Sequence, residues 1–214
     1  MSVTIMRSQA PQFRVPPMVP GRPAPQHAAP VLHVAAEASV FSQGDAARCM
    51  YRVVSGLVRA CAFQADGRRH IDAFYRPGDV FGFELNGVHT LCAEAVSDCT
   101  LVALRQPALQ SDPQEAAQLY HYAMQALQRA QTHALLLGRC NAPQKLAHFL
   151  LDLPALGPVV ELVTSRQDIA DYLGLTIETI SRTLSQLERD GVVKLISARR
   201  IQFLDKSRLE ALTR

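Results

Sequence analysis

TSRQDIADYLGLTIETISRTLSQLERDG, residues 164–191, is the stretch that decides the fold. Thr164 or Ser165 can cap the start of a first helix, because a side-chain oxygen there can accept a free backbone N–H. Gly174 suits the left-handed position that commonly ends a helix. Thr176 can then cap a second helix. The stretch therefore predicts two helices joined by a tight turn.

The spacing of three residues within this stretch favours one particular motif. Ala170, Gly174 and Ile180 are separated by four and then by six positions. A small residue allows two helices to cross closely, a glycine allows a tight turn, and a branched apolar residue fixes the second helix against the first. Together these features predict a helix-turn-helix, whose second helix enters the major groove of DNA.

The second helix, which we expect to run to about Asp190, carries a polar face. Glu178, Ser181 and Arg182 project from it at helical spacing. Arginine can pair with a guanine edge through two hydrogen bonds, and glutamate can accept one from the amino group of cytosine. A Glu–Arg pair four residues apart is also a common surface ion pair. Its place near the start of a recognition helix favours base contacts, so we predict that these three residues read DNA bases.

The charge around this helix also favours DNA. Between Thr176 and Arg208, seven cations against four acids give +3, which equals the net charge of the whole chain. Helix N-termini present free amides to phosphate, and basic turns attract it. We predict DNA backbone contacts from Ser165, Arg166, Thr176, Thr179, Ser185, Arg199 and Arg200.

The flanking sequence completes a C-terminal domain, which we place at residues 141–214. Residues 142–151 form a helical pattern with Leu146, Phe149 and Leu150 on one face. VVKLI and IQFL are strand-like and follow the helix-turn-helix, so they predict a two-stranded wing. A final short helix in SRLEAL has Ser207 as its expected cap.

Residues 31–112 are expected to form a β domain. MYRVVSG, LVRACAFQ and HIDAFY are short strand-like runs bounded by turn residues. Asp66-Gly67 between two of them is a strong hairpin signal. Many short strands at this spacing are typical of a barrel or sandwich.

Residues 113–140 change to a helical pattern. Apolar side chains recur at alternating steps of four and three, which is a coiled-coil-like stripe. The stripe can pack on its own domain, but its narrow, alanine-rich character favours a dimer interface. It begins at Ala116, and the residues that we predict in the interface are Tyr120, Ala123, Leu127, Ala130, Ala134 and Leu137.

Residues 1–30 hold seven of the 13 prolines and are expected to form a disordered arm. The arm carries three arginines and no acid, so it is either a solvated tail or a weak contact with DNA or another partner. The sequence shows no secretion signal. No apolar run approaches the roughly 18 residues of a membrane span. We therefore expect a cytoplasmic protein.

The composition allows a large aliphatic core, because 48% of residues are hydrophobic and none is tryptophan. The five cysteines are scattered and form no C-x-x-C pair. This pattern argues against a zinc site, an iron–sulfur cluster and a disulfide framework. We expect the cysteines to be small buried residues and predict no metal and no cofactor.

At this point the chain resembles the Crp/Fnr family of bacterial regulators over about residues 31–210. SRQDIADYLGLTIETISRTLSQLERDGVV is similar to the family's winged helix-turn-helix, and YRVVSGLVRACAFQADGRRHIDAFYRPGDVFGFE to its cyclic-nucleotide-type β-roll. The resemblance implies an α+β fold: a β-roll, a long dimerisation helix and a C-terminal winged helix-turn-helix.

The pattern formed by Glu178, Ser181 and Arg182 resembles that of the Fnr and FixK branch. This resemblance implies a palindrome of the type TTGAT-N4-ATCAA, in which Glu178 and Arg182 read the central G·C pair and Ser181 contacts an adjacent T. It also implies a homodimer, mainly activating, that recruits RNA polymerase in a low-oxygen or nitrogen-fixation regulon. The hairpin tip is the implied polymerase contact, through Gln64, Asp66 and Arg68, although it can equally be a simple exposed turn.

Residues that depart from the family pattern indicate which branch of the family the chain resembles. Residues 1–48 contain no cysteine, so the iron–sulfur ligands of oxygen-sensing Fnr proteins are missing. No arginine follows the Phe81–Glu84 segment where nucleotide-binding members hold the cyclic phosphate. Ser181 stands where some FixK-type proteins carry an oxidisable cysteine. The chain is thus most similar to FixK-type regulators that need no cofactor.

Two other classes of function remain. The β-roll can be a sensor that binds haem or a small effector, although none of the histidines His70, His89, His121 and His133 stands in a specific motif. An enzyme is the third hypothesis, but the sequence holds no nucleophile motif, phosphate loop or metal constellation. We therefore predict that the protein is not an enzyme.

Overall fold

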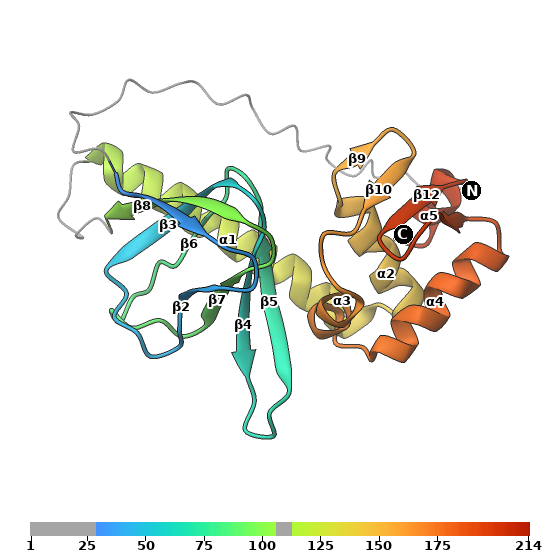
Figure 1. Ribbon diagram of the computed structural model, residues 1–214, viewed down its shortest axis with the longest axis horizontal. Helices are drawn as coiled ribbons and strands as arrows, with labels where there is room; N and C mark the ends of the chain where they lie inside the picture. The colour runs from blue at the N-terminus through green and yellow to red at the C-terminus, as the bar shows by residue number, and fades with distance from the viewer. Residues whose placement is uncertain (1–28, 106–112) are drawn as a thin grey trace, which may run out of the picture.

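A computed structural model describes residues 29–105 and 113–214 (Figure 1). The predicted N-terminal arm lies almost wholly outside these residues. The described chain forms a β-roll, a long helix and a C-terminal α/β domain in that order, which confirms the predicted fold class. None of the described helices is both long and apolar enough to cross a membrane.

The β-roll consists of two antiparallel four-stranded sheets, ordered β1-β8-β3-β6 and β2-β7-β4-β5. Its core is made of inward-facing side chains such as Val53, Val58, Phe81 and Leu101, each at most 1% exposed. Strand alternation places every second residue on this side. The strands are β1 (Val31–Val34), β2 (Ser39–Phe41), β3 (Cys49–Ser55), β4 (Val58–Phe63), β5 (Arg69–Tyr75), β6 (Val80–Phe81), β7 (Cys92–Ala95) and β8 (Cys99–Arg105).

The predicted hairpin joins β4 to β5, where Phe63 pairs with Arg69. Gly67 adopts a φ of 82°, which a glycine reaches without steric cost. The two strands extend well beyond the rest of the roll (Figure 1). The Asp-Gly signal was therefore correct, and the hairpin tip is presented away from the domain.

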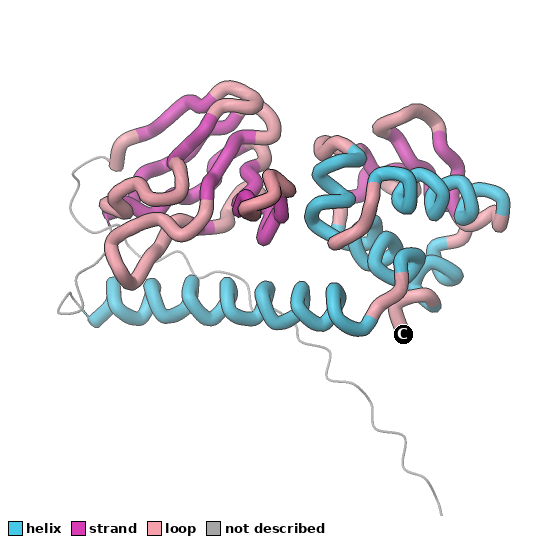
Figure 2. Tube along the Cα trace, turned by 90° about the horizontal axis from the view of Figure 1, so that it is seen from below, coloured by secondary structure: helices cyan, strands magenta, loops and turns pink. Residues whose placement is uncertain are grey.

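Helix α1 (Pro113–Arg139) covers the range of the apolar stripe. It passes along the β-roll and ends beneath the C-terminal domain (Figure 2). Helix α2 begins almost immediately, with Asn141 as its N-cap in a reciprocal capping box with Gln144. A break of two residues thus separates the helix that follows the roll from the first helix of the C-terminal domain.

The C-terminal domain packs its helices over a small sheet. Leu146 and Leu150 of α2 meet Ile169 of α3 and Ile180 and Leu184 of α4 in one buried core. The elements are α2 (Ala142–Asp152), β9 (Ala155–Leu156), β10 (Val159–Glu161), α3 (Arg166–Leu173), α4 (Ile177–Arg189), β11 (Val193–Leu195), β12 (Arg200–Phe203) and α5 (Lys206–Ala211).

Two details of this domain differ from the sequence prediction. The wing belongs to a four-stranded sheet, ordered β11-β12-β10-β9, and not to an isolated two-stranded ribbon. Strands β9 and β10 are too short to give a periodic signal, and the tertiary fold pairs β10 with β12 and β9 with β10. The last helix is capped by Asp205, whose carboxylate accepts the Arg208 N–H at 3.0 Å, and not by Ser207.

Candidate nucleic-acid interface

Helix α3 is the first helix of the motif and has a well-formed start and end. Ser165, not Thr164, is its N-cap: the Ser165 hydroxyl accepts the Asp168 N–H at 3.0 Å, and Asp168 accepts the Ser165 N–H in return. Gly174 ends the helix with a φ of 61° and a ψ of 42°. The local sequence therefore fixes both the beginning of α3 and the tight turn into α4.

Helix α4 is the expected recognition helix, and its two faces differ sharply. Thr176 caps it by accepting the Thr179 N–H at 3.2 Å. Ile180 and Leu184 are at most 1% exposed and pack against α3. Because these residues fix the rotation of the helix, the opposite face is held toward solvent.

The three predicted base readers lie together on that outer face. Ile177 joins Glu178, Ser181 and Arg182 around one shallow hollow. Hydrogen bonds from its own backbone N–H and from the Thr176 hydroxyl, with the charge of Arg182, hold the pKa of Glu178 below its ordinary value. A charged acceptor and a guanidinium donor thus lie on the same face of α4, and these are groups that can pair with cytosine and guanine edges.

Ser181 has a neighbour that the sequence did not indicate. The Arg166 guanidinium donates to the Ser181 hydroxyl at 3.3 Å, so it reaches from α3 to the outer face of α4. Arg166 was predicted as a phosphate contact only. The structure places Arg166 in contact with one of the three residues predicted to read bases.

The remaining predicted backbone contacts fall into two groups. The first group lies on α3 and α4. The hydroxyls of Ser165 and Thr176 cap the two helices. The Thr179 hydroxyl lies 3.1 Å from the Thr176 hydroxyl, and Ser185 is half-buried further along α4. Helix starts offer backbone N–H groups to phosphate even when the cap side chain is engaged.

The wing tip carries the other group, Arg199 and Arg200. Both are exposed, and the Ser197 hydroxyl accepts both of their backbone N–H groups, at 3.3 and 3.1 Å. Arg199 also lines a cavity of about 300 Å³ that it shares with Glu37 and Arg59 of the β-roll. The wing tip therefore lies beside the boundary between the two domains.

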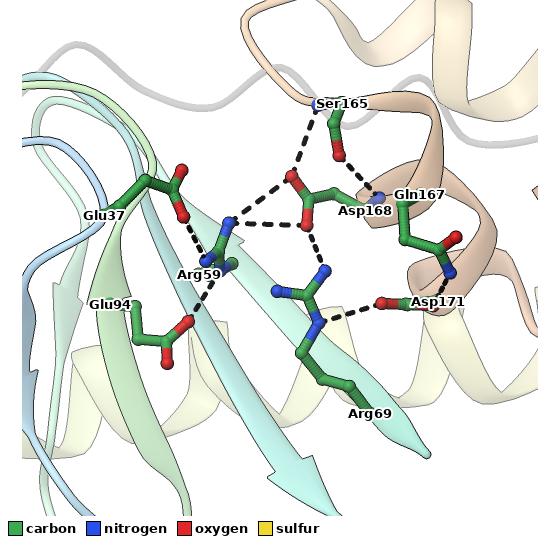
Figure 3. Close-up of polar contacts among 8 residues, drawn as sticks. All are labelled: Glu37, Arg59, Arg69, Glu94, Ser165, Gln167, Asp168 and Asp171. Carbon is green, nitrogen blue, oxygen red and sulfur yellow. Dashed lines mark hydrogen bonds and ion pairs between the residues drawn. The ribbon is translucent and has the colours of Figure 1, made fainter. Parts of the chain in front are cut away.

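Arg59 and Arg69 of the β-roll are residues that the sequence reasoning missed. Both form ion pairs with α3, and Arg59 is only 5% exposed (Figure 3). An arginine in a short strand carries no local signal of its partner, because Arg59 and Asp168 are 109 positions apart.

The interior of the β-roll is filled by rings. Phe41 stacks on His89 with centroids 3.6 Å apart, and Tyr51 and Phe81 lie next to them. The Glu84 carboxylate, which follows Phe81 in the loop, accepts the backbone N–H and hydroxyl of Thr90, both at 2.9 Å. This loop is thus held by internal hydrogen bonds.

The histidines that the structure describes do not form a ligand set for a metal ion. His89 is 2% exposed and its Nδ1 has no hydrogen-bond partner, while burial lowers its pKa despite the nearby acids Glu84 and Asp45. His133 stacks on Tyr172 at 4.1 Å between centroids. In residues 29–105 and 113–214, no three histidine, cysteine or acidic side chains are grouped so as to hold a metal ion.

The hairpin tip is an exposed, locally paired turn. Asp66 accepts the Arg68 guanidinium at 2.7 Å, and backbone and side-chain hydrogen bonds from Arg68 lower the pKa of Asp66. The Gln64 N–H donates to the Arg68 carbonyl at 2.8 Å and closes the loop. All three residues predicted to meet RNA polymerase are exposed.

The predicted dimer stripe is largely uncovered in a single chain. Tyr120 is 67% exposed and Leu127 49% exposed. The alanines at 123, 130 and 134 are exposed as well, whereas Leu137 is half-buried. A Cβ atom on Gly174 would lie 3.5 Å from the Leu137 side chain, so Leu137 lies beside the turn of the helix-turn-helix.

Two family patterns match this chain. The cyclic nucleotide-binding domain matches residues 31–111, and the Crp-like helix-turn-helix domain matches residues 144–212. These ranges correspond to the β-roll and the C-terminal domain.

Sequence and structure relatives agree with these patterns. The nitrogen fixation regulation protein FixK of Azorhizobium caulinodans is 45% identical over 190 residues, which cover 83% of this chain and 77% of that protein. FixK of Bradyrhizobium diazoefficiens is 38% identical, covering 87% and 83% of the two chains. The solved structure of FixK2 from Bradyrhizobium japonicum superposes with a TM-score of 0.81 at 38% identity, covering 87% of this chain and 98% of that one.

The fold, the capped helix pair and these relatives lead to one assignment: the chain belongs to the Crp/Fnr family and is a FixK-type transcription regulator with a helix-turn-helix DNA-binding domain.

Proposed function

We propose that this regulator acts as a cytoplasmic homodimer that binds a TTGAT-N4-ATCAA-type palindrome and activates transcription by contacting RNA polymerase. Glu178 and Arg182 read the central G·C pair of each half-site, and Ser181 contacts the adjacent T. The observation that carries the proposal is the outer face of α4, where these three side chains surround one hollow. In this proposal the β-roll is a scaffold that needs no cofactor. The protein acts by binding and not by catalysis.

Two further features support the dimer and the polymerase contact. The exposed stripe that includes Tyr120 and Leu127 runs along α1, where a second copy can pair with it. A two-fold dimer suits a palindrome whose half-sites lie roughly 34 Å apart. The hairpin tip around Asp66 is exposed to solvent, where a polymerase subunit can reach it. The FixK relatives, which are named for nitrogen fixation, favour a low-oxygen or nitrogen-fixation regulon.

The DNA assignment is tested by fluorescence anisotropy with the palindromic duplex and with a duplex in which each central G·C pair is replaced by A·T. Arg182→Ala should weaken binding to the palindrome by about 1–3 kcal/mol, because a bidentate guanine contact is lost. The same variant should discriminate poorly between the two duplexes. Arg189→Ala is the matched control, since Arg189 is an exposed arginine at the far end of the same helix.

The site assignment fails if Arg182→Ala retains both the affinity and the base preference of the wild type. A uniform loss of affinity on both duplexes would place Arg182 on phosphate instead of on a base. Equal losses in the Arg182 and Arg189 variants would indicate a general charge effect.

An effector-gated sensor of the same family is the alternative function. His89 favours it, because its buried Nδ1 has no hydrogen-bond partner and lies 4.0 Å from the Glu84 carboxylate. An absorption spectrum of the purified protein and a binding titration with added cyclic nucleotide separate the two proposals. A Soret band, or DNA binding that depends on the nucleotide, would support the sensor.

A further inference from the structure

A cluster of six charged side chains joins the β-roll to the DNA-binding domain. Figure 3 shows the guanidinium groups of Arg59 on β4 and Arg69 on β5 directed at the acidic face of α3. We call this set the interdomain clamp; its members are Glu37, Arg59, Arg69, Glu94, Asp168 and Asp171.

Arg59 is the buried centre of the clamp. Its guanidinium donates to Glu37 at 2.7 Å and to Glu94 at 2.8 Å, both within the roll, and lies 3.4 Å from both oxygens of Asp168 on α3. Burial alone would lower the pKa of Arg59, but the hydrogen bonds with Glu37 and Glu94 and the charge of Asp168 raise it. The arginine is therefore a fixed cation with acids on both sides of the domain boundary.

Arg69 makes a second connection to the same helix. Its Nε donates to Asp171 at 2.8 Å, and its terminal nitrogen forms an ion pair with Asp168. The side chain of Arg69 is 19% exposed and that of Asp168 is 4% exposed. A guanidinium has the planar fork that can hold two carboxylates at once, which an ammonium group cannot reproduce.

Asp168 links the clamp to the start of the helix-turn-helix. The same carboxylate that faces both arginines also accepts the Ser165 N–H in the capping box of α3. Helix α3 in turn holds α4 through the tight turn at Gly174 and the core around Ile180. Because the turn and the core fix α4 against α3, the orientation of α3 sets the orientation of α4.

Separating the domains would take Arg69, Asp168 and Asp171 away from their partner charges, whereas Arg59 would keep Glu37 and Glu94 within the roll. An ion pair that is this deeply buried is strongly destabilised when one partner is removed, because the remaining charge is left in a poorly solvated place. Neighbouring contacts act in the same direction: Arg76 reaches Asp152 at 2.8 Å, and Phe74 lies 5.2 Å from Tyr172 between ring centroids.

We propose that Arg59 and Arg69 are positioning residues for DNA binding: through Asp168 and Asp171 they hold the helix-turn-helix in the orientation in which α4 reads a half-site. This inference rests on the proposed function, since it names what sets the geometry of the same recognition helix. A dimer must present two such helices at one fixed spacing. The clamp therefore reduces the loss of orientational freedom that accompanies binding.

A double-mutant cycle on the full-length protein tests the proposal. Arg69→Gln, Asp171→Asn and the double variant are compared with the wild type for affinity to the palindromic duplex. Arg69→Gln should weaken binding about fivefold or more, which is the usual lower range of coupling between sites. The double variant should bind about as weakly as Arg69→Gln alone, because both changes remove the same contact.

Two further variants separate positioning from charge. Arg52→Gln removes one exposed arginine from β3 of the roll and should keep wild-type affinity. Arg69→Lys keeps the charge but lacks the fork, so it should recover only part of the loss. An Arg52 variant as weak as the Arg69 variant would overturn the proposal, and so would losses that simply multiply in the double variant.

Hydrogen exchange by mass spectrometry gives a readout that does not depend on DNA. Arg69→Gln should speed amide exchange in α3 and β5 while α2 and β11 keep their protection. Unchanged exchange in α3 would contradict the clamp even if DNA affinity fell. The opposite combination is also informative: Arg69→Gln speeds exchange in α3, but the wild-type protein does not bind the palindromic duplex. That result would support the clamp as a contact between the domains and would refute the proposed function.

Discussion

Gly174 shows how much can depend on one residue. It adopts a φ of 61° between the two helices of the motif, a conformation that a residue with a Cβ atom enters only at a cost. Space is not the constraint there, because the nearest side-chain atom would lie 3.5 Å from an added Cβ. The backbone conformation alone therefore explains the glycine.

This explanation predicts opposite effects at two glycines. Gly174→Ala should lower the free energy of unfolding by about 1–2 kcal/mol, because alanine is strained in the left-handed region. Gly138→Ala, within α1 and with open space around it, should raise the free energy by about 0.4–1 kcal/mol. Urea denaturation of both variants measures the difference. A stabilised Gly174 variant would contradict the assigned role.

At the scale of elements, α1 is the helix with the most uncovered apolar surface. Its stripe of small and large apolar residues remains exposed in one chain, and Tyr120 and Leu127 are the largest members. Such a face on a helix of 27 residues is typical of a partner interface. A second copy of the chain is the partner that the proposed palindromic site would require.

We therefore expect Leu127→Glu to shift the protein from dimer to monomer, because a charge would be buried in the seam. Light scattering after size exclusion measures the mass. Gln128→Glu is the control, since it adds the same charge one position away, outside the stripe. A dimeric Leu127 variant would place the interface on another surface.

At the scale of the whole molecule, the contact between α1 and α3 includes a buried histidine. His133 is 8% exposed, stacks on Tyr172 and lies 2.8 Å from the Tyr172 carbonyl through Nε2. Burial lowers its pKa, although the Tyr172 carbonyl and Asp72 oppose the change, and His70 on β5 lowers it further. Both domains and α1 thus meet at one titratable ring.

The pKa shift predicts loss of stability in acid. The unfolded chain takes up a proton near pH 6.5, whereas the folded protein resists it, so the unfolded state binds more protons below that pH. Stability should be full above about pH 6.5 and should fall as the pH drops toward the lowered pKa of folded His133. In His133→Gln the dependence should be flatter, and thermal unfolding from pH 8 to pH 5 measures both. Equal slopes in the two proteins would exclude His133 as the cause.

The sequence by itself determined the features that depend on residues close together in the chain. Caps, the glycine turn, helical periodicity and the Asp-Gly hairpin act over a few positions, so residues 164–191 predicted the helix pair and its outer face correctly. The prediction that Glu178, Ser181 and Arg182 read bases came from the same local spacing, and the structure places these three residues around one hollow.

Only the tertiary structure decided which distant segments meet. Strands β9 and β10 join the sheet of the wing although neither has a periodic sequence pattern. The sequence indicated Arg166 only as a phosphate contact, whereas the structure shows that it contacts Ser181. The clamp is the clearest case, because Arg59 and Asp168 lie 109 positions apart and neither has a local reason to be buried. Burial of a charge depends on a partner that folding brings to it, and for this reason the connection between the β-roll and the recognition helix could not be predicted from the sequence.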